Sequence, residues 1–168
     1  MSATVESTNT AIDATLSFFE AYNNHQVDRM VNLCSEGAQL RYVPMGERGQ
    51  GKASQVGKAI WSGLIDAFPD LHVTVQSIFG DERNVAAEVM IGGTQRKDFL
   101  NIPSKGEHYE LPHAFLLKVD ERKMITGITA YWDNASFYSQ LGKTTLNCAK
   151  KNGSGRSILR ETGTSRCS

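Results

Sequence analysis

The sequence predicts an α+β fold in which three N-terminal helices pack on a curved, mainly antiparallel sheet. Apolar residues before Leu71 recur mostly with the spacing of helices, whereas those after it alternate with polar residues as they do in strands. Helices followed by a run of strands are typical of α+β domains, with the helices on one face of the sheet. A doubly wound α/β fold would need helices between the strands, and almost no helical period follows Leu71.

Three amphipathic helices are expected before the sheet. The first runs from about Ala11 to Tyr22, where apolar residues recur at i, i+4 and i+7, and the polar segment 23–25 breaks it. A short second helix covers about 27–34. The third runs from about Ala53 to Phe68, and Pro69 stops it because proline cannot continue a helix.

The strands begin with a brief one over Gln39 to Val43. Residues 71–76 alternate apolar and polar side chains, and a polar turn at 80–84 joins them to a largely apolar strand over 85–91. The glycine pair 92–93 then marks a bulge or bend. These segments predict a hairpin in the first half of the sheet.

Two long strands, over 111–119 and 124–132, complete the expected sheet. Asp133 or Asn134 follows at once and is a suitable N-cap for a last turn of helix. Gly142 would end that helix.

Composition is that of an ordinary globular domain, with 40% hydrophobic and 21% charged residues among 168. We expect one domain over 11–142, preceded by a polar, disordered N-terminus over 1–10. No window is apolar enough for a membrane span, and 1–10 lacks the apolar core of a secretory signal. These features favour a cytoplasmic protein without membrane contact.

The segment 143–168 is a basic, polar and, we expect, disordered tail. It carries six Lys or Arg and one acid, so the body before it has 12 basic and 17 acidic side chains, a net charge of −5. A basic tail can touch nucleic acid or an anionic surface. It has no aromatics to stack on bases and no dense run of charge, so a solvated extension without nucleic-acid binding is favoured.

The cysteines and histidines do not predict a metal site. Cys34, Cys148 and Cys167 are an odd number without ligand spacing, and reduced thiols are the simplest interpretation. No pair of histidines or carboxylates has metal-site spacing, and no glycine loop suited to phosphate is present. The expectation is a protein without metal or cofactor.

Several short motifs together resemble one family. They are Tyr22-Asn23-Asn24-His25 with Asp28, Ala67-Phe68-Pro69-Asp70-Leu71, Gly92-Gly93-Thr94-Gln95, Ile102-Pro103-Ser104-Lys105-Gly106, Trp132-Asp133 and Gln140-Leu141-Gly142. In this order, over about Ala11 to Gly142, the chain resembles a SnoaL-like polyketide cyclase (ester cyclase) domain of the nuclear-transport-factor-2-like (NTF2-like) superfamily.

The resemblance implies a cone-shaped α+β barrel with a deep apolar pocket, often dimeric through the open face of the sheet. Characterised cyclases of the family close a ring by intramolecular aldol condensation without metal or cofactor. An aspartate serves as acid and base, and a histidine lies nearby. The expected partners are therefore a hydrophobic small molecule and a second copy of the chain, in a homodimer.

Asp133 is the first candidate for catalysis. The resemblance implies this role, because an acid recurs in the family just before the last helix. The alternative is an N-cap that accepts backbone N–H bonds, which would lower the pKa of the carboxyl group although acid–base work wants it raised. The sequence also departs from the aklanonic-type cyclases, whose catalytic aspartate aligns three residues earlier, at Ala130.

His113 is the second candidate. It lies on the face of its strand that also carries Leu111, Phe115 and Leu117, which is otherwise apolar. A lone histidine on such a face is usually a buried side chain with satisfied hydrogen bonds. Because this face should point into the cone, we expect His113 to contact a ligand and to orient or stabilise an enolate.

Large apolar side chains are expected to line the pocket, where they would suit a planar or polycyclic ligand. Packing in a core is the alternative for each of them. The set is Tyr42, Trp61, Phe68, Met90, Phe99, Tyr131 and Trp132.

These observations favour a cofactor-free cyclase or isomerase in which Asp133 removes a proton α to a carbonyl. Classical ketosteroid isomerase chemistry needs an acid in the strand over 39–43, and none is present. Hydration or dehydration in the same pocket stays open. The competing class is a non-catalytic ligand-binding or dimerisation module with the same fold, since this fold hosts many functions.

Overall fold

The computed structural model describes residues 10–143, and the predicted disordered ends lie almost wholly outside them. The helices are α1 (Ala11–Asn23), α2 (Val27–Asn32), α3 (Lys58–Ala67) and α4 (Asn134–Gln140). The strands are β1 (Cys34–Tyr42), β2 (Gln50–Lys52), β3 (His72–Gly80), β4 (Asn84–Thr94), β5 (His108–Val119) and β6 (Ile125–Trp132). Two helical turns, η1 (Val43–Gly49) and η2 (Ala53–Gly57), flank β2.

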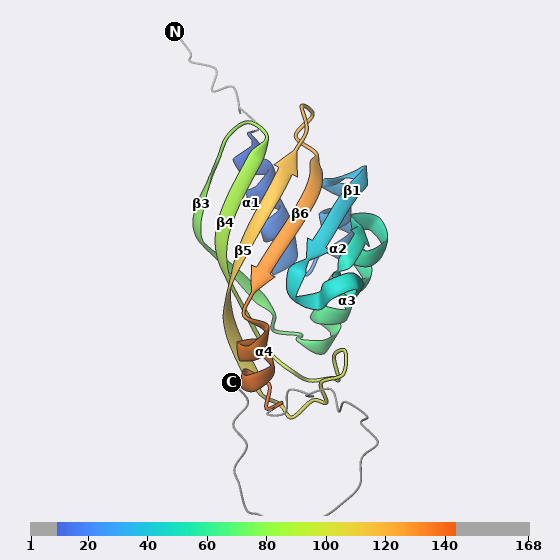
Figure 1. The fold of residues 1–168 in the computed structure, drawn as a ribbon, viewed down its shortest axis with the longest axis vertical. Coiled ribbons are helices and arrows are strands. Elements are labelled where there is room, and N and C mark those ends of the chain that lie inside the picture. Colours follow the sequence, from blue (N-terminus) through green and yellow to red (C-terminus); the bar gives the residue numbers. More distant parts are fainter. Residues whose placement is uncertain (1–9, 144–168) are drawn as a thin grey trace, which may run out of the picture.

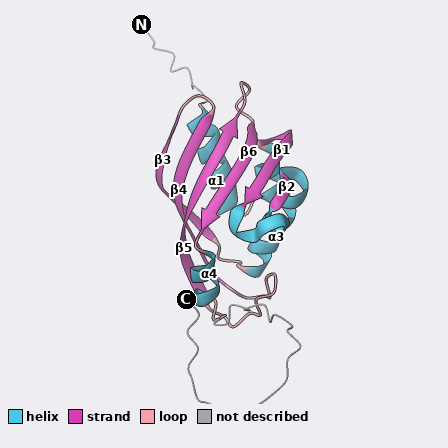
Figure 2. Cartoon of the chain, viewed as in Figure 1, coloured by secondary structure: helices cyan, strands magenta, loops and turns pink. Residues whose placement is uncertain are grey.

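The predicted α+β class is confirmed. Six strands form one sheet in the order β2-β1-β6-β5-β4-β3, and every neighbouring pair is antiparallel except β1 and β6. The sheet curves but does not close, and the first three helices lie on one side of it (Figures 1 and 2). None of the helices in the described part of the chain is long and apolar enough to cross a membrane.

The first helix begins at a capping box, in which the Thr10 hydroxyl accepts from the Asp13 backbone and the Asp13 carboxylate accepts from the Thr10 backbone. Its apolar stripe buries Phe18, Phe19 and Tyr22 against the sheet. The stripe faces β3, β4 and β5, so α1 closes the core on that side.

Side chains in the motifs that marked the family fasten the end of α1 to the sheet. The Asn23 side chain accepts from the Val73 amide at 2.8 Å, and His25 Nε2 donates to the Leu71 carbonyl at 2.6 Å. The Asp70 carboxylate accepts from the Thr94 amide at 2.7 Å. These three bonds fix where β3 starts relative to α1 and β4.

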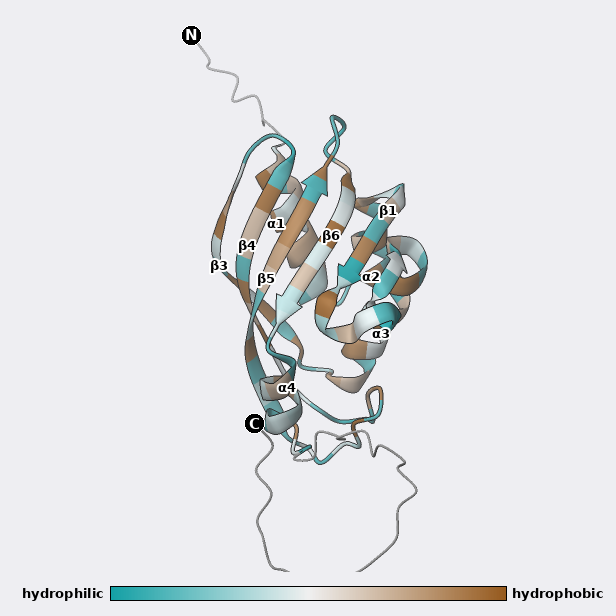
Figure 3. Cartoon of the chain, viewed as in Figure 1, coloured by the Kyte–Doolittle hydropathy of each residue, from teal (hydrophilic) through white to brown (hydrophobic). Residues whose placement is uncertain are grey.

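The sheet shows the expected alternation. On β5 the buried positions include Leu111, Phe115 and Leu117, as predicted for the inward face, and Tyr109 continues the same row. Hydrophilic and hydrophobic residues alternate along the strands in Figure 3. Several element boundaries differ from the prediction. The strand β1 already begins at Cys34, β5 begins at His108, and α3 begins at Lys58 because η2 occupies 53–57.

Candidate functional site

A cavity of about 160 Å³ lies at the end of the sheet where β6 leads into α4. Its wall comes from all the elements that meet there: α1, β1, η1, α3, β4, β5, β6, α4 and the connection over 95–107. An engineered cavity of roughly 150 Å³ is known to take up benzene. The cavity therefore has room for about one ring of a ligand.

His113 on β5 is part of this wall and is half-buried. Its Nδ1 atom lies 2.9 Å from the Leu111 carbonyl oxygen. A carbonyl oxygen only accepts, so Nδ1 carries the ring proton and Nε2 keeps a free lone pair. Burial lowers the pKa of His113 from 6.5 to about 4, and the bond to Leu111 offsets this only in part. His113 is therefore neutral near pH 7, with Nε2 able to accept a proton or a hydrogen bond.

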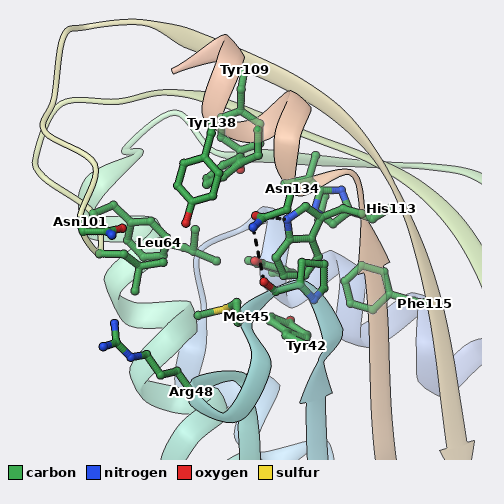
Figure 4. A pocket seen from close by; sticks show the side chains of 17 residues that line it. Tyr42, Met45, Arg48, Leu64, Asn101, Tyr109, His113, Phe115, Asn134 and Tyr138 are labelled. Carbon is green, nitrogen blue, oxygen red and sulfur yellow. Dashed lines mark hydrogen bonds between the residues drawn. The ribbon is translucent and has the colours of Figure 1, made fainter. Parts of the chain in front are cut away.

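Aromatic rings hold His113 in place. Its ring centroid lies 5.2 Å from that of Trp132, its partner on β6, and 6.2 Å from that of Phe115. Tyr42 on β1 packs edge-on against Trp132, with 5.6 Å between ring centroids. Figure 4 shows His113, Phe115 and Tyr42 together on one side of the cavity.

Tyr42 is positioned from behind by Trp61 of α3. The Trp61 indole Nε1 donates to the Tyr42 hydroxyl oxygen at 2.8 Å. The tyrosine proton is thus free to donate, and within residues 10–143 no acceptor for it is present. Burial raises the pKa of Tyr42, so the hydroxyl stays protonated at physiological pH.

Asn134 joins two elements at the cavity. Its side-chain oxygen accepts from Trp132 Nε1 at 3.4 Å, and its amide nitrogen donates to the Pro44 carbonyl at 3.4 Å. Both bonds are long, so they orient the side chains rather than hold them strongly. They bring η1 up to the start of α4 (Figure 4).

Asp133 lies outside the cavity wall and caps α4. Its carboxylate accepts from the backbone amides of Ala135 and Ser136 at 3.0 and 3.1 Å, and from the Ser136 hydroxyl at 2.8 Å. The Ser136 hydroxyl and amide lower the pKa of Asp133, and the side chain is exposed. The geometry therefore favours the capping interpretation of Asp133 over the catalytic one.

Four of the residues predicted for the site do line the cavity: His113, Tyr42, Phe99 and Trp132. The prediction for two others is corrected by strand alternation. Met90 pairs with Pro112 and Tyr131 with Ala114, on the face of the sheet that points away from the helices. Tyr131 and Trp132 are neighbours in one strand, so they cannot face the same side.

Trp61 and Phe68, which were also predicted to line the pocket, do not line the cavity. Both are fully buried but stand behind the cavity wall, as part of the core. Trp61 supports Tyr42, and the Phe68 ring packs edge-on against Tyr109 with 5.1 Å between centroids. Phe137 of α4 closes the same cluster.

Several lining residues were missed by the sequence reasoning. The polar ones are Tyr22, Arg48, Asn101, Tyr109, Asn134 and Tyr138. Tyr109 could have been found, because it shares a face of β5 with His113. Arg48 and Asn101 come from irregular segments, where no period shows which way a side chain points.

The cavity wall, as far as residues 10–143 describe it, contains no Asp or Glu side chain. Within the same residues no three His, Cys, Asp or Glu side chains are arranged to hold a metal ion. The polar groups available to a ligand are thus a neutral imidazole, phenol hydroxyls, two amides and one guanidinium. They suit a carbonyl or carboxyl compound with an apolar body.

Comparison with family models shows a match to the SnoaL-like polyketide cyclase family over residues 12–141. A comparison with curated proteins found no significant match. Among solved structures, AclR from Streptomyces galilaeus, described as a candidate hydroxylase, is similar with a TM-score of 0.68 and 18% identity. The match covers 80% of this chain and 86% of AclR.

Two other similar structures are described as candidate polyketide cyclases. IdmH from Streptomyces antibioticus has a TM-score of 0.67 and 22% identity, over 79% of this chain and 98% of IdmH. A SnoaL-like protein from Jannaschia sp. CCS1 has a TM-score of 0.67 and 17% identity, over 80% of this chain and 92% of the Jannaschia chain. At these identities the structures share the fold with this chain.

Proposed function

Because the chain belongs to the SnoaL-like polyketide cyclase family, we propose that it is a cofactor-free cyclase or isomerase acting on a hydrophobic carbonyl compound. One ring of the substrate would occupy the cavity. The observation that supports this most is the imidazole of His113 in an aromatic cavity wall, whose Nε2 atom carries the lone pair and has no hydrogen-bond partner within residues 10–143.

His113 would serve as the base. Its Nε2 atom takes the proton α to the substrate carbonyl, and the electron pair of the broken C–H bond moves to the carbonyl oxygen as an enolate. The neutral Tyr42 hydroxyl is a suitable donor to that oxygen. In a cyclase the enolate carbon then attacks a second carbonyl, and the imidazolium gives its proton to the alkoxide that forms. In an isomerase the imidazolium gives the proton to another carbon of the conjugated enolate.

The low pKa of His113 restricts the substrate. Burial lowers the pKa of His113 and makes it a weak base, so it is best suited to an acidic C–H proton, such as one flanked by two carbonyls or by a carbonyl and a ring. The same property makes the imidazolium a strong acid, so returning the proton is easy. The substrate class that fits is an activated carbonyl compound, not a simple ketone.

A non-catalytic ligand-binding module is the second candidate. It is favoured by the lack of a carboxylate in the described cavity wall and by the capping bonds that occupy Asp133. In that case the same cavity would hold a ring without changing it. A dimer through the outer face of the sheet is compatible with either function, and the exposed Phe79, Leu116 and Tyr131 support it.

Deuterium exchange separates the two candidates. β-Tetralone has an activated methylene group beside its ring, and its loss of α-protons in D₂O can be followed by NMR. We expect the protein to accelerate this exchange, and His113→Gln to remove roughly 10²-fold or more of the acceleration. Asp133→Asn is the matched control and should keep it. Binding of β-tetralone without exchange would favour the non-catalytic module, and undiminished exchange in His113→Gln would exclude His113 as the base.

A further inference from the structure

Arg48 is the cationic side chain in the cavity wall, and it comes from η1. It is exposed, and within residues 10–143 its guanidinium forms no ion pair or hydrogen bond. Its neighbour Glu47 is exposed and not part of the wall. Arg48 therefore presents an uncompensated positive charge where the cavity opens.

A second cation stands near the same opening. The Lys143 ammonium donates to the Asn101 carbonyl at 3.3 Å and lies 4.9 Å from the centroid of the Tyr138 ring. Asn101 and Tyr138 both line the cavity. Arg48 and Lys143 thus place two positive charges at this end of the cavity, and the described wall contributes no Asp or Glu to offset them.

The two ends of the cavity differ in chemistry. In Figure 4, Arg48 and Asn101 lie on one side, while His113 and Phe115 lie on the other. Apolar side chains, Met45 and Leu64, lie between them. A ligand that fills this space would have a polar reacting group near His113, an apolar middle, and a negatively charged group near Arg48.

We propose that the natural ligand is an aromatic or alicyclic keto acid whose free carboxylate binds Arg48 while its carbonyl end faces His113. This rests on the proposal that the cavity binds a hydrophobic carbonyl compound, and it adds the charge of that compound. A carboxylate fits because the planar guanidinium can donate two parallel hydrogen bonds to it. A neutral ester or amide would leave Arg48 without its charge partner.

The test uses two probes that differ only in this charge, β-benzoylpropionate and its amide, β-benzoylpropionamide. Their affinities are measured by titration calorimetry on the full chain at low and high ionic strength, with NMR signals of the Trp132 indole showing that the probe is in the cavity. We expect the acid to bind about tenfold more tightly than the amide at low salt, and salt to reduce the difference.

Three variants assign the preference. Arg48→Gln should weaken the binding of the acid about tenfold and leave the affinity for the amide unchanged. Lys143→Gln should have a smaller effect in the same direction. Arg41→Gln is the matched control, because Arg41 is equally cationic and exposed but lies on β1 away from the cavity wall.

The outcomes are distinct. Two results would overturn the proposed carboxylate and leave the cavity proposal standing. The first is that the wild-type protein binds both probes with equal affinity. The second is that Arg48→Gln loses affinity for the acid and the amide to the same extent. A loss of acid binding in Arg41→Gln as large as in Arg48→Gln overturns it too, since the effect would then be one of net charge. If neither probe disturbs Trp132, the carboxylate and the cavity proposal both fail.

Discussion

His113 and Trp132 are direct cross-strand partners on β5 and β6, and their ring centroids lie 5.2 Å apart. Tyr42, on the next strand, packs edge-on against the same indole. Three adjacent strands thus hold an imidazole, an indole and a phenol at one end of the sheet. Side chains fixed by strand pairing keep their orientation better than side chains on loops, which suits a site that must present one lone pair to a ligand.

The buried His113 makes stability depend on pH. The pKa of His113 is about 4 in the folded protein, against 6.5 for an ordinary histidine. The unfolded chain therefore binds a proton as the pH falls through 6.5, whereas the folded chain does so only near pH 4. His113 should lower the free energy of unfolding progressively over that window, by up to about 3 kcal/mol.

Urea unfolding of the wild-type protein and His113→Gln at several pH values checks this. The variant should lose less stability between pH 6.5 and 4 than the wild-type protein. Parallel pH profiles for the two proteins would show that His113 titrates normally, and its burial would then not govern its protonation.

Trp61 and Tyr42 should behave as a coupled pair. Tyr42→Phe leaves the Trp61 indole N–H buried without an acceptor, and Trp61→Phe removes the donor to the Tyr42 hydroxyl. Each change should cost about 1–3 kcal/mol of unfolding free energy. The double variant should cost less than the sum, by about 1 kcal/mol, in a double-mutant cycle measured by urea unfolding. Strict additivity would mean that the bond does not contribute.

Asp133 should matter for stability rather than for turnover. Asp133→Ala removes the acceptor for the Ala135 and Ser136 amides at the start of α4, so the melting temperature should fall. Asparagine is also a good N-cap, so Asp133→Asn should stay closer to the wild-type value. Equal melting temperatures for the wild-type protein and Asp133→Ala would contradict the capping role.

Leu100 occupies a position that suits glycine. Its φ is +53°, in the left-handed region, between Phe99 and Ile102, which pair with each other. The side chain is 50% exposed and lines the cavity opening. Leu100→Gly should therefore raise the unfolding free energy, by up to about 1 kcal/mol, while weakening the binding of β-tetralone. Lower stability in this variant would show that packing of the leucine outweighs the backbone strain.

The alternation of residues along a strand allows part of the site to be predicted from the sequence. It placed His113 on the inward face of β5 because its neighbours at two-residue spacing are apolar, and the structure confirms that face. The same rule, applied strictly, would have excluded Tyr131 and Met90. Size and aromatic character do not show which face of a strand a side chain lies on, whereas the parity of its position does.

The rest of the site lies where no period exists. Arg48 belongs to η1, whose path depends on Gly46 with φ of +60°, and Asn101 belongs to the connection over 95–107. Their directions follow from tertiary contacts, not from local pattern. In the same way, the sequence marked Asn23, His25 and Asp70 as family motifs, but only the structure shows that they tie α1, β3 and β4 together.

Nitrogen NMR of the His113 imidazole tests the central claim most directly. The ring should be neutral with its proton on Nδ1 from neutral pH down to about pH 4, and β-tetralone should shift the Nε2 resonance. Titration of His113 near its ordinary pKa of 6.5, a proton on Nε2, or an Nε2 resonance that does not respond to β-tetralone would contradict the account of His113 as a neutral base in a ligand cavity.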